Sequence, residues 1–310
     1  MRSTIIPRHV RTLTLETPSQ PGRPAHVSAA SGLVRAGDSL YVVADDENHL
    51  GIFPAADDAD GTLARIAEGT LPLRKDPRKR RKPDFEALAR LPGFGGHEHG
   101  VVLALGSCSK PNRCRGVALG LDARGGLDGT RVEIDLAPLR DALDARFGRL
   151  NVEGAVVMGE ELVLMQRGNK GDQRNARIRL RLDLVFDAIV AGREIGLKAL
   201  LDIHEHDLGE IGGVPLCFSD VAALPDGRLV FTAIAEDTAD SYEDGECRGA
   251  AIGVLDADGS LLMLEALEGC PKVEGVEVAG EDPVRVLLVT DADDEKVPAV
   301  LLAAQLPNFT

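Results

Sequence analysis

The sequence has 310 residues, of which 44% are hydrophobic and 27% are charged, a composition typical of a folded globular protein. It contains 50 Asp and Glu but only 35 Lys and Arg, which gives a formal net charge of −15. This balance disfavours nucleic acids and anionic membranes as partners, because both attract basic surfaces. Aromatic residues make up only 3% and tryptophan is absent, so aliphatic side chains must form the core.

Targeting signals and cysteine spacing bear on the compartment. A proline, two arginines and a histidine within residues 7–11 interrupt the first apolar segment, so no signal peptide is predicted. No stretch approaches the roughly 18 apolar residues of a membrane span. Cys108 and Cys114 form a C-x5-C pair that fits neither a redox C-x-x-C motif nor a zinc knuckle. We therefore expect reduced thiols in a cytoplasmic protein.

A short element recurs five times along the chain, and each copy precedes a second apolar run that ends in polar residues. The copies read SGLV, DFEAL, NVEGAVV, DVAAL and KVEGVEV. We align them on Ser31, Glu86, Glu153, Ala222 and Glu274, which lie 52 to 69 residues apart. Spacing that varies in this way is typical of loops inserted into a common structural unit.

Each unit continues with two further apolar runs, so it indicates four short strands separated by turn signals, as in a propeller blade. The fifth unit ends after its third strand, and the N-terminal run VRTLTLET can supply the fourth. We therefore predict an all-β, single-domain, five-bladed β-propeller over residues 1–310, closed by pairing of this N-terminal strand with the last blade. The expected bounds are 10–17 for the closing strand and about 28–70, 84–140, 151–207, 218–268 and 272–306 for the four-stranded blades. Residues 135–148 and 184–192 have helical spacing, and we interpret them as excursions from the blades.

A basic segment, LRKDPRKRRKP, separates the first two units and contains seven Lys or Arg residues. It can be a solvated, mobile loop, or an arm that binds anions over the mouth of the ring. Its last basic residue, Lys82, lies four positions before Glu86, so the segment must end close to that mouth.

Propeller geometry predicts where the polar residues gather. The starts of the first strands and the ends of the second strands lie on the same face of the ring, because neighbouring strands run antiparallel. The third strands also begin on this face. We expect a funnel there that contains Asp84, Glu86, Asn151, Glu153, Asp220, Lys272 and Glu274 from first strands, Asp45, Asp46, Gln166, Asn169, Glu236, Asp237, Asp291, Asp293 and Asp294 from second strands, and Arg115 and Arg248 from third strands.

Three equivalent glutamates around a narrow channel repel one another unless positive charge lies among them. That charge can come from a hard cation, for which Ca²⁺ fits better than zinc, or from nearby Lys and Arg. The metal-ligand candidates are Asp45, Asp46, Glu86, Glu153, Glu274 and Asp291, and the candidates for binding a ligand are Lys82, Arg115, Gln166, Asn169 and Arg248. Glu86, Glu153 and Glu274 are also candidate catalytic acids or bases. Alternatively, these acids only cap backbone N–H groups of the next blade.

The SGL and LYVVADD segments, together with the recurrent DFEA and VEG segments, resemble bacterial propellers of the esterase-like phytase and SdiA-regulated families. The resemblance rests on Ser31-Gly32-Leu33, on Asp45-Asp46, on Asp84-Phe85-Glu86-Ala87 and on Glu153-Gly154. It implies a propeller fold and a calcium-assisted phosphoester hydrolase. Ala222 departs from the pattern, because it stands where the fourth unit would carry the acid.

Three functions follow as hypotheses. The leading one is a propeller that binds a small polar or anionic ligand in its acid-rich funnel, with or without Ca²⁺. The second is a metal-assisted hydrolase of phosphoesters or glycosides, in which one glutamate acts as a general base. The third is an interaction scaffold for a protein partner.

Overall fold

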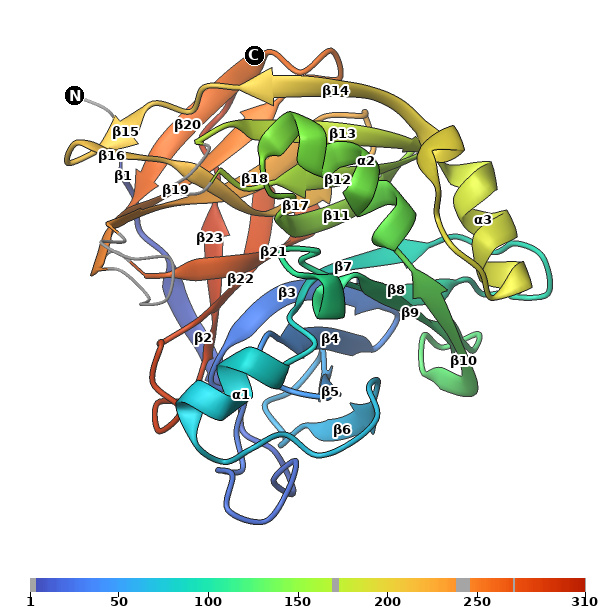
Figure 1. Ribbon diagram of the computed structural model, residues 1–310. Helices are drawn as coiled ribbons and strands as arrows, with labels where there is room; N and C mark the ends of the chain where they lie inside the picture. The colour runs from blue at the N-terminus through green and yellow to red at the C-terminus, as the bar shows by residue number, and fades with distance from the viewer. Residues whose placement is uncertain (1–3, 169–172, 238–245, 270, 310) are drawn as a thin grey trace.

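The computed structural model describes residues 4–168, 173–237, 246–269 and 271–309, and its architecture is mainly β (Figure 1). Five antiparallel sheets form its blades. The first blade contains β3 (Ala30–Ala36), β4 (Ser39–Ala44), β5 (His49–Pro54) and β6 (Thr62–Arg65). The second contains β7 (Phe85–Leu91), β8 (Val101–Gly106), β9 (Arg115–Leu121) and β10 (Leu127–Asp135). The third contains β11 (Val152–Met158), β12 (Glu161–Gln166), β13 (Asn175–Arg181) and β14 (Leu200–His206).

The remaining two blades come from the C-terminal part of the chain. The fourth contains β17 (Cys217–Ala223), β18 (Leu229–Asp237), β19 (Glu246–Leu255) and β20 (Leu261–Leu267), preceded by a small hairpin of β15 (Glu210–Ile211) and β16 (Val214–Pro215). The fifth contains β21 (Val273–Glu281), β22 (Val284–Thr290) and β23 (Val300–Gln305). The first strands contact one another in a closed ring, in the order β3, β7, β11, β17, β21 and back to β3. The prediction of a five-bladed, all-β propeller is confirmed.

N-terminal strands complete two of the blades. β2 (Arg8–Thr12) pairs antiparallel with β23, which makes the fifth blade four-stranded and confirms closure of the ring by the N-terminal segment. The strand begins two residues before the predicted start at residue 10 and ends at Thr12, because the chain then bends to make an isolated bridge between Thr14 and His26. β1 (Thr4–Ile5) was not anticipated, and it adds to the fourth blade by pairing parallel with β20.

Helices occur in three of the connections. The basic segment, for which we considered a mobile loop, forms the helix α1 (Lys75–Arg81). The predicted excursions form α2 (Ala137–Phe147), after β10, and α3 (Leu182–Ala191), after β13. The described residues also form two short 3-10 turns, η1 (Pro111–Arg113) and η2 (Leu197–Ala199). Within the described residues, no helix combines the length and apolar character needed to cross a bilayer.

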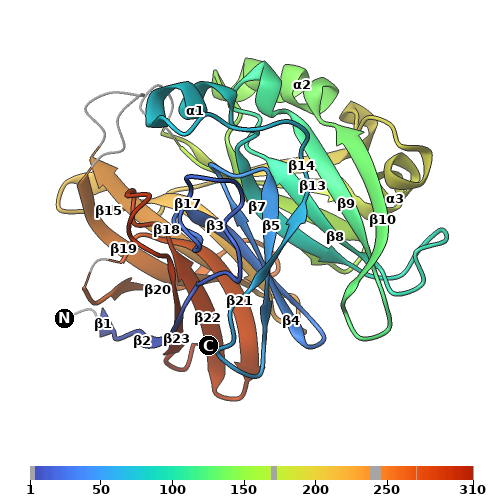
Figure 2. The same cartoon turned by 90° about the horizontal axis from the view of Figure 1, so that it is seen from below.

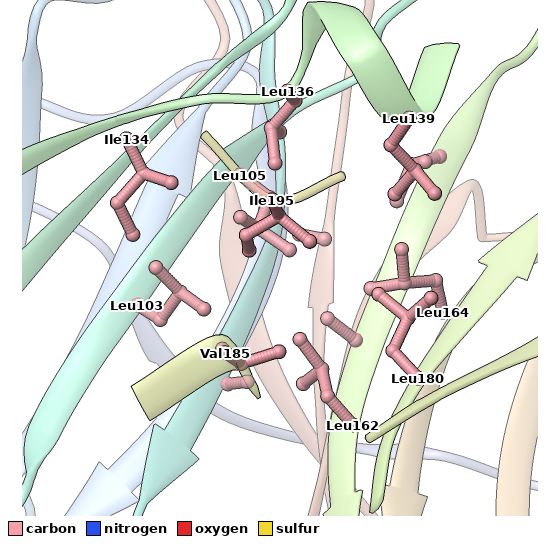
Figure 3. Packing of buried hydrophobic residues seen from close by; sticks show 14 of the residues in the cluster. Leu103, Leu105, Ile134, Leu136, Leu139, Leu162, Leu164, Leu180, Val185 and Ile195 are labelled. Atoms are coloured by element: carbon pink, nitrogen blue, oxygen red, sulfur yellow. The ribbon is translucent and has the colours of Figure 1, made fainter. Parts of the chain in front are cut away.

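The excursions α2 and α3 pack on the outer part of the second and third blades. Figure 3 shows Leu139 of α2 and Val185 of α3 among leucines of β8, β12 and β13. Leu139 is 1% exposed and Val185 is fully buried. Because burial of such side chains stabilises a fold by roughly 1.5–3 kcal/mol each, this packing holds the end of α2 at a fixed place beside the ring.

A β-bulge lies near the start of every first strand. The pairing with the second strand shifts by one residue at Ser31, Glu86, Glu153, Ser219 and Glu274. A bulge leaves the extra residue outside the regular pairing, so it can place a side chain where a regular strand would not. The bulge corrects one detail of the repeat: the fourth-blade counterpart of the glutamates is Ser219 and not Ala222, because the apolar DVAAL pattern begins one residue after the bulge.

The residue that follows each bulge lies where the strands approach the axis most closely. It is glycine in three blades, and a Cβ atom on Gly154 would come within 2.9 Å of the Asp220 Cα. The fourth blade has Asp220 at this position, where one carboxylate oxygen accepts a hydrogen bond of 2.8 Å from the Val276 N–H of the next blade. Burial raises the pKa of Asp220 well above its usual range. The side chain therefore links two blades at the axis.

Replacement of Asp220 tests this link. Asp220→Ala should lower the free energy of unfolding by about 1–3 kcal/mol, because it leaves the buried Val276 N–H without an acceptor. Asp220→Asn keeps a neutral oxygen acceptor and should cost clearly less. Chemical denaturation of the two variants measures both values, and equal losses would contradict the role of the carboxyl oxygen.

Candidate functional site

One face of the ring contains an open cavity of about 1380 Å³. Its floor is formed near the starts of the first strands, where Glu86, Glu153 and Glu274 contribute side chains. Its rim includes α1, the η1 turn and the C-terminal end of α2. Figure 2 shows α1 and α2 on the same face of the molecule. The first strands of all blades start on the same face of the ring, and residues that are distant in the sequence therefore meet at one site.

The structure brings most, but not all, of the predicted site residues to this cavity. Seven of the candidates line it: Asp45, Asp46, Lys82, Glu86, Glu153, Glu274 and Asp291. Gln166 is fully buried behind it, and its side-chain oxygen accepts a hydrogen bond of 2.7 Å from the Asn151 N–H. Arg115 and Arg248 are exposed and lie outside the cavity lining. Asn169 lies outside the described residues.

Near η1, Arg113 and Lys110 line the cavity, whereas the predicted Arg115 does not. Arg113 ends the η1 turn, two residues before the position that we predicted. Its Nη1 donates a hydrogen bond of 2.6 Å to one Asp84 oxygen. The turn accounts for the difference, because its last residue, Arg113, is buried at the cavity, whereas Arg115, the first residue of β9, is exposed.

Asp84 is the centre of the first charge cluster. Lys82 Nζ lies 2.7 Å from its Oδ1 and also contacts Asp45, while Ser107 Oγ donates a 2.5 Å hydrogen bond to its Oδ2. Burial alone would raise the pKa of Asp84, but Lys82 and Arg113 outweigh it and lower that pKa. Asp84 has φ of 61°, a left-handed conformation that costs an ordinary residue energy. The surrounding cations and hydroxyl group hold the carboxylate there.

Asp46 holds the basic helix α1 in place. It forms ion pairs with Arg78 of α1 (Nε to Oδ2, 3.3 Å) and with Arg23 (Nη2 to Oδ2, 2.8 Å). Arg78 is 3% exposed and also contacts Glu295 at 2.5 Å. These pairs fix the basic helix at the rim, so α1 is an anchored wall of the cavity and not a solvated loop.

A second charge cluster joins the third, fourth and fifth blades through Arg167. Its guanidinium lies 3.3 Å from Glu153 Oε2, 2.7 Å from Glu236 Oε2 and 3.8 Å from Glu274 Oε1. Lys272 Nζ lies 3.3 Å from Glu274 Oε1 and 3.2 Å from Asp291 Oδ2. Buried charges of one sign are stable only with such partners. The repulsion that we anticipated among the glutamates is therefore balanced by cations of the chain itself.

Arg167 was missing from the sequence prediction although a signal for it existed. It directly follows the end of β12, as Asp45 follows β4 and Asp291 follows β22. All three line the cavity. The sequence prediction selected Gln166 and Asn169 in this loop instead. The exact residue at which the strand ends could not be predicted, so the residue that faces the cavity could not be identified.

Glu86 and Glu153 are the carboxyl groups with the least compensation. Glu86 is 8% exposed, and within the described part of the chain its carboxylate has no hydrogen-bond or ion-pair partner. Burial, Asp84 and Glu153 raise its pKa well above the usual range. Burial also raises the pKa of Glu153 to about 7 despite the opposing effect of Arg167. Both groups therefore bind a proton at higher pH than an exposed glutamate does, and for Glu153 this occurs near neutral pH.

A cation could be held by three acids in this floor. Carboxylate oxygens of Asp45, Asp84 and Glu86 lie within 4.8 Å of one another. Oxygen donors of this kind suit a hard divalent cation. However, the Lys82 ammonium already contacts two of these acids, so a cation fits this set only when Lys82 moves away.

The other predicted metal ligands are engaged in ion pairs. Asp46 pairs with arginines, Glu153 and Glu274 contact Arg167, and Asp291 contacts Lys272. The candidate metal centre is therefore smaller than the set expected from the sequence, and it includes Asp84, which was not named there as a ligand.

Comparisons with known proteins place the chain among propellers. Residues 26–306 match the sequence family DUF6929, which is described as a family of unknown function. No curated protein matches by sequence. The glutaminyl cyclase of Myxococcus xanthus is similar in structure, with a TM-score of 0.52, 9% identity and coverage of 99% of this chain and 100% of that chain.

Two other solved structures are less similar. The α-L-arabinanase of Cellvibrio cellulosa has a TM-score of 0.48 at 12% identity and covers 89% of this chain and 90% of its own. A putative gluconolactonase has a TM-score of 0.38 at 10% identity, with coverage of 97% and 100%. At these identities the likeness to the cyclase shows the fold alone, and the two weaker likenesses add no argument.

Proposed function

The chain belongs to DUF6929, and from the geometry of its cavity we propose that it binds a small polar ligand that carries both an anionic group and hydroxyl groups. The observation that carries this proposal is that basic side chains of α1, η1 and the segment after α2 line one side of the rim, while buried carboxyl groups lie in the floor. The cavity of about 1380 Å³ is concave and lined by many charged side chains, so it offers a small polar ligand several polar contacts at once.

The rim supplies the binding groups for the anion. Arg80 at α1 and Arg149 after α2 are exposed and line the cavity, and Arg113 lines it beside Asp84. Guanidinium groups present several donors in one plane, which matches the oxygens of a carboxylate or phosphate. The net charge of −15 does not prevent this, because the basic groups act at short range inside the cavity.

The floor supplies the groups for hydroxyl recognition. A protonated carboxyl donates one hydrogen bond and accepts others, so it can bind a hydroxyl in either direction. Glu86 has this capacity unused, because no described side chain bonds to it. Asn151 Nδ2 donates a 2.5 Å hydrogen bond to Glu153 Oε1, which fixes the orientation of the second carboxyl group.

Binding of a hexose monophosphate, compared with inorganic phosphate and with the unphosphorylated hexose, tests the proposal. The phosphorylated sugar should raise the melting temperature most. At a concentration of 100 times its Kd, a ligand raises the free energy of unfolding by about 2.7 kcal/mol. Arg80→Gln combined with Arg149→Gln should weaken binding at least tenfold, while Arg181→Gln, on an exposed residue outside the cavity, should not. Equal responses of all three proteins, or no response to any of the probes, would contradict the proposal.

A second candidate function is hydrolysis by general acid–base catalysis. The supporting observation is the pKa of Glu153, about 7, beside a second carboxyl group that also protonates easily. General catalysis is most effective when the pKa lies near the working pH. Turnover of p-nitrophenyl phosphate or p-nitrophenyl glycosides should fall about 100-fold or more in Glu153→Gln. Absence of turnover in the wild-type protein would leave binding as the function.

We propose that Ca²⁺ and the Lys82 ammonium compete for the same carboxylates. Lys82→Met removes the ammonium that contacts Asp45 and Asp84, and it should create a site for Ca²⁺ on the three acids. Calcium should then raise the melting temperature of Lys82→Met much more than that of the wild-type protein. The same response in both proteins would show that Lys82 does not compete with the cation.

A further inference from the structure

We propose that Cys108 and Cys114 form a redox modification site, a dithiol that a peroxide converts reversibly into a disulfide beside the cavity. The two residues enclose the η1 turn, and Ser109, Lys110 and Arg113 between them line the cavity. The proposal is independent of the ligand proposed above. No sequence motif indicated it, because the C-x5-C spacing does not match known redox motifs.

The backbone brings the two thiols together. The Cys108 N–H donates to the Arg113 carbonyl (3.3 Å), so the residue directly before Cys114 lies against Cys108. Cys114 Sγ donates hydrogen bonds to the carbonyl oxygens of Cys108 (3.6 Å) and Lys110 (3.3 Å), so this thiol lies against the backbone of Cys108. A disulfide needs Cα atoms about 4.4–6.8 Å apart, and these two backbone contacts bring the chain segments at Cys108 and Cys114 side by side.

The surroundings distinguish the two thiols. Arg140 Nη1 of α2 lies 3.8 Å from Cys114 Sγ. The neighbouring Cys108 side chain lowers the pKa of Cys114, and Arg140 lowers that pKa further against the effect of burial. The neighbouring Cys114 side chain and burial raise the pKa of Cys108 well above its usual range. Cys114 is therefore the thiol that becomes a thiolate first, and the thiolate is the reactive form.

The reaction with hydrogen peroxide is balanced. The Cys114 thiolate attacks one peroxide oxygen, the O–O bond breaks, and the leaving hydroxide takes a proton to form water. Cys114 is then a sulfenic acid. The Cys108 sulfur attacks the Cys114 sulfur as it gives up its proton, and the second water leaves. Two thiols and one peroxide thus give one disulfide and two water molecules, and a dithiol reductant reverses the change.

Oxidation would act on the floor of the cavity through the enclosed turn. Arg113 and Ser109 both contact the Asp84 carboxylate, Arg113 at 2.6 Å and Ser109 at 3.4 Å. Ser107, directly before Cys108, donates to the same oxygen. A bond between Cys108 and Cys114 would restrict this turn, which supplies two of the partners of Asp84 and adjoins a third, Ser107.

Peptide mapping of the intact, folded protein after treatment with hydrogen peroxide tests the proposal. Trypsin cleaves after Arg113 and Arg115, so the disulfide should leave the dipeptide Cys114-Arg115 attached to the peptide that contains Cys108. The attached species should have lost two hydrogen atoms and should disappear after reduction. Cys217→Ser removes a thiol that lines the cavity and should leave the cross-link unchanged.

Two further variants make the outcome decisive. Cys108→Ser should stop the reaction at Cys114 sulfenic acid, detected by a dimedone adduct, and Cys114→Ser should give neither cross-link nor adduct at Cys108. Both are close in size to the wild type, and circular dichroism checks that they fold. A wild-type protein with no 108–114 cross-link, or one that forms only irreversible sulfinic acid, would overturn the proposal.

Discussion

Arg167→Met should lower the free energy of unfolding by about 3–5 kcal/mol, the cost expected when one partner of a buried ion cluster is removed. The guanidinium contacts carboxylates from three blades, and its own side chain is only 14% exposed. Methionine keeps most of the apolar stem but leaves Glu153, Glu236 and Glu274 with less positive charge. Urea unfolding at pH 8 measures the loss.

The pH dependence and a control identify the cause. The loss should shrink as the pH falls from 8 to 5, because protonation of the glutamates removes the repulsion that the variant exposes. Arg146→Met is the matched control: Arg146 pairs with Glu205 at 2.8 Å, but the side chains are 45% and 39% exposed. An exposed pair of this kind contributes about 0–1 kcal/mol. Comparable losses in the two variants would contradict the bridging role of Arg167.

Glu153→Gln should make the stability less dependent on pH between about 4.5 and 7. Burial raises the pKa of Glu153 from 4.5 to about 7, so in this range the native state binds more protons than the unfolded state. The free energy of unfolding of the wild-type protein therefore falls as the pH rises through this range. The difference between the two pKa values corresponds to about 3 kcal/mol. Unfolding curves at pH 4.5, 6 and 8 measure this contribution, which glutamine removes.

Glu277→Gln provides the control for this prediction. Burial also raises the pKa of Glu277 to about 7, but its side chain lies outside the cavity lining. Both variants should therefore flatten the pH dependence of stability, while only Glu153→Gln should change binding or turnover in the cavity. A change of binding in Glu277→Gln as large as in Glu153→Gln would show that stability, rather than the local carboxyl group, controls the site.

The ring of carboxylates could be predicted from the sequence because it follows from the repeat. Glu86, Glu153 and Glu274 occupy one phase of a unit that recurs five times, so any closed ring brings them to one face. The closing strand was also predictable, since a fifth unit without a fourth strand leaves an unpaired edge. These conclusions needed only strand order and not atomic detail.

The partners of these carboxylates depend on details that strand order does not contain. The η1 turn decides that Arg113, and not Arg115, reaches the cavity. A single bulge decides that Ser219 is the counterpart of the glutamates. The Arg78 ion pairs decide that the basic segment forms a fixed wall. Each of these is a local feature of one blade or loop. A search for repeats detects only what the units share, so it does not reveal such features.

The positive groups of the floor, Lys82, Arg167 and Lys272, are covalently part of the polypeptide. Their number per site is therefore fixed at synthesis, and dilution or a chelating agent cannot remove them. The pocket should keep its shape in a medium depleted of divalent ions. Conversely, the loss of stability caused by substituting one of these three residues should not be restored by adding ions, because a free ion does not make the same contacts to several blades at once.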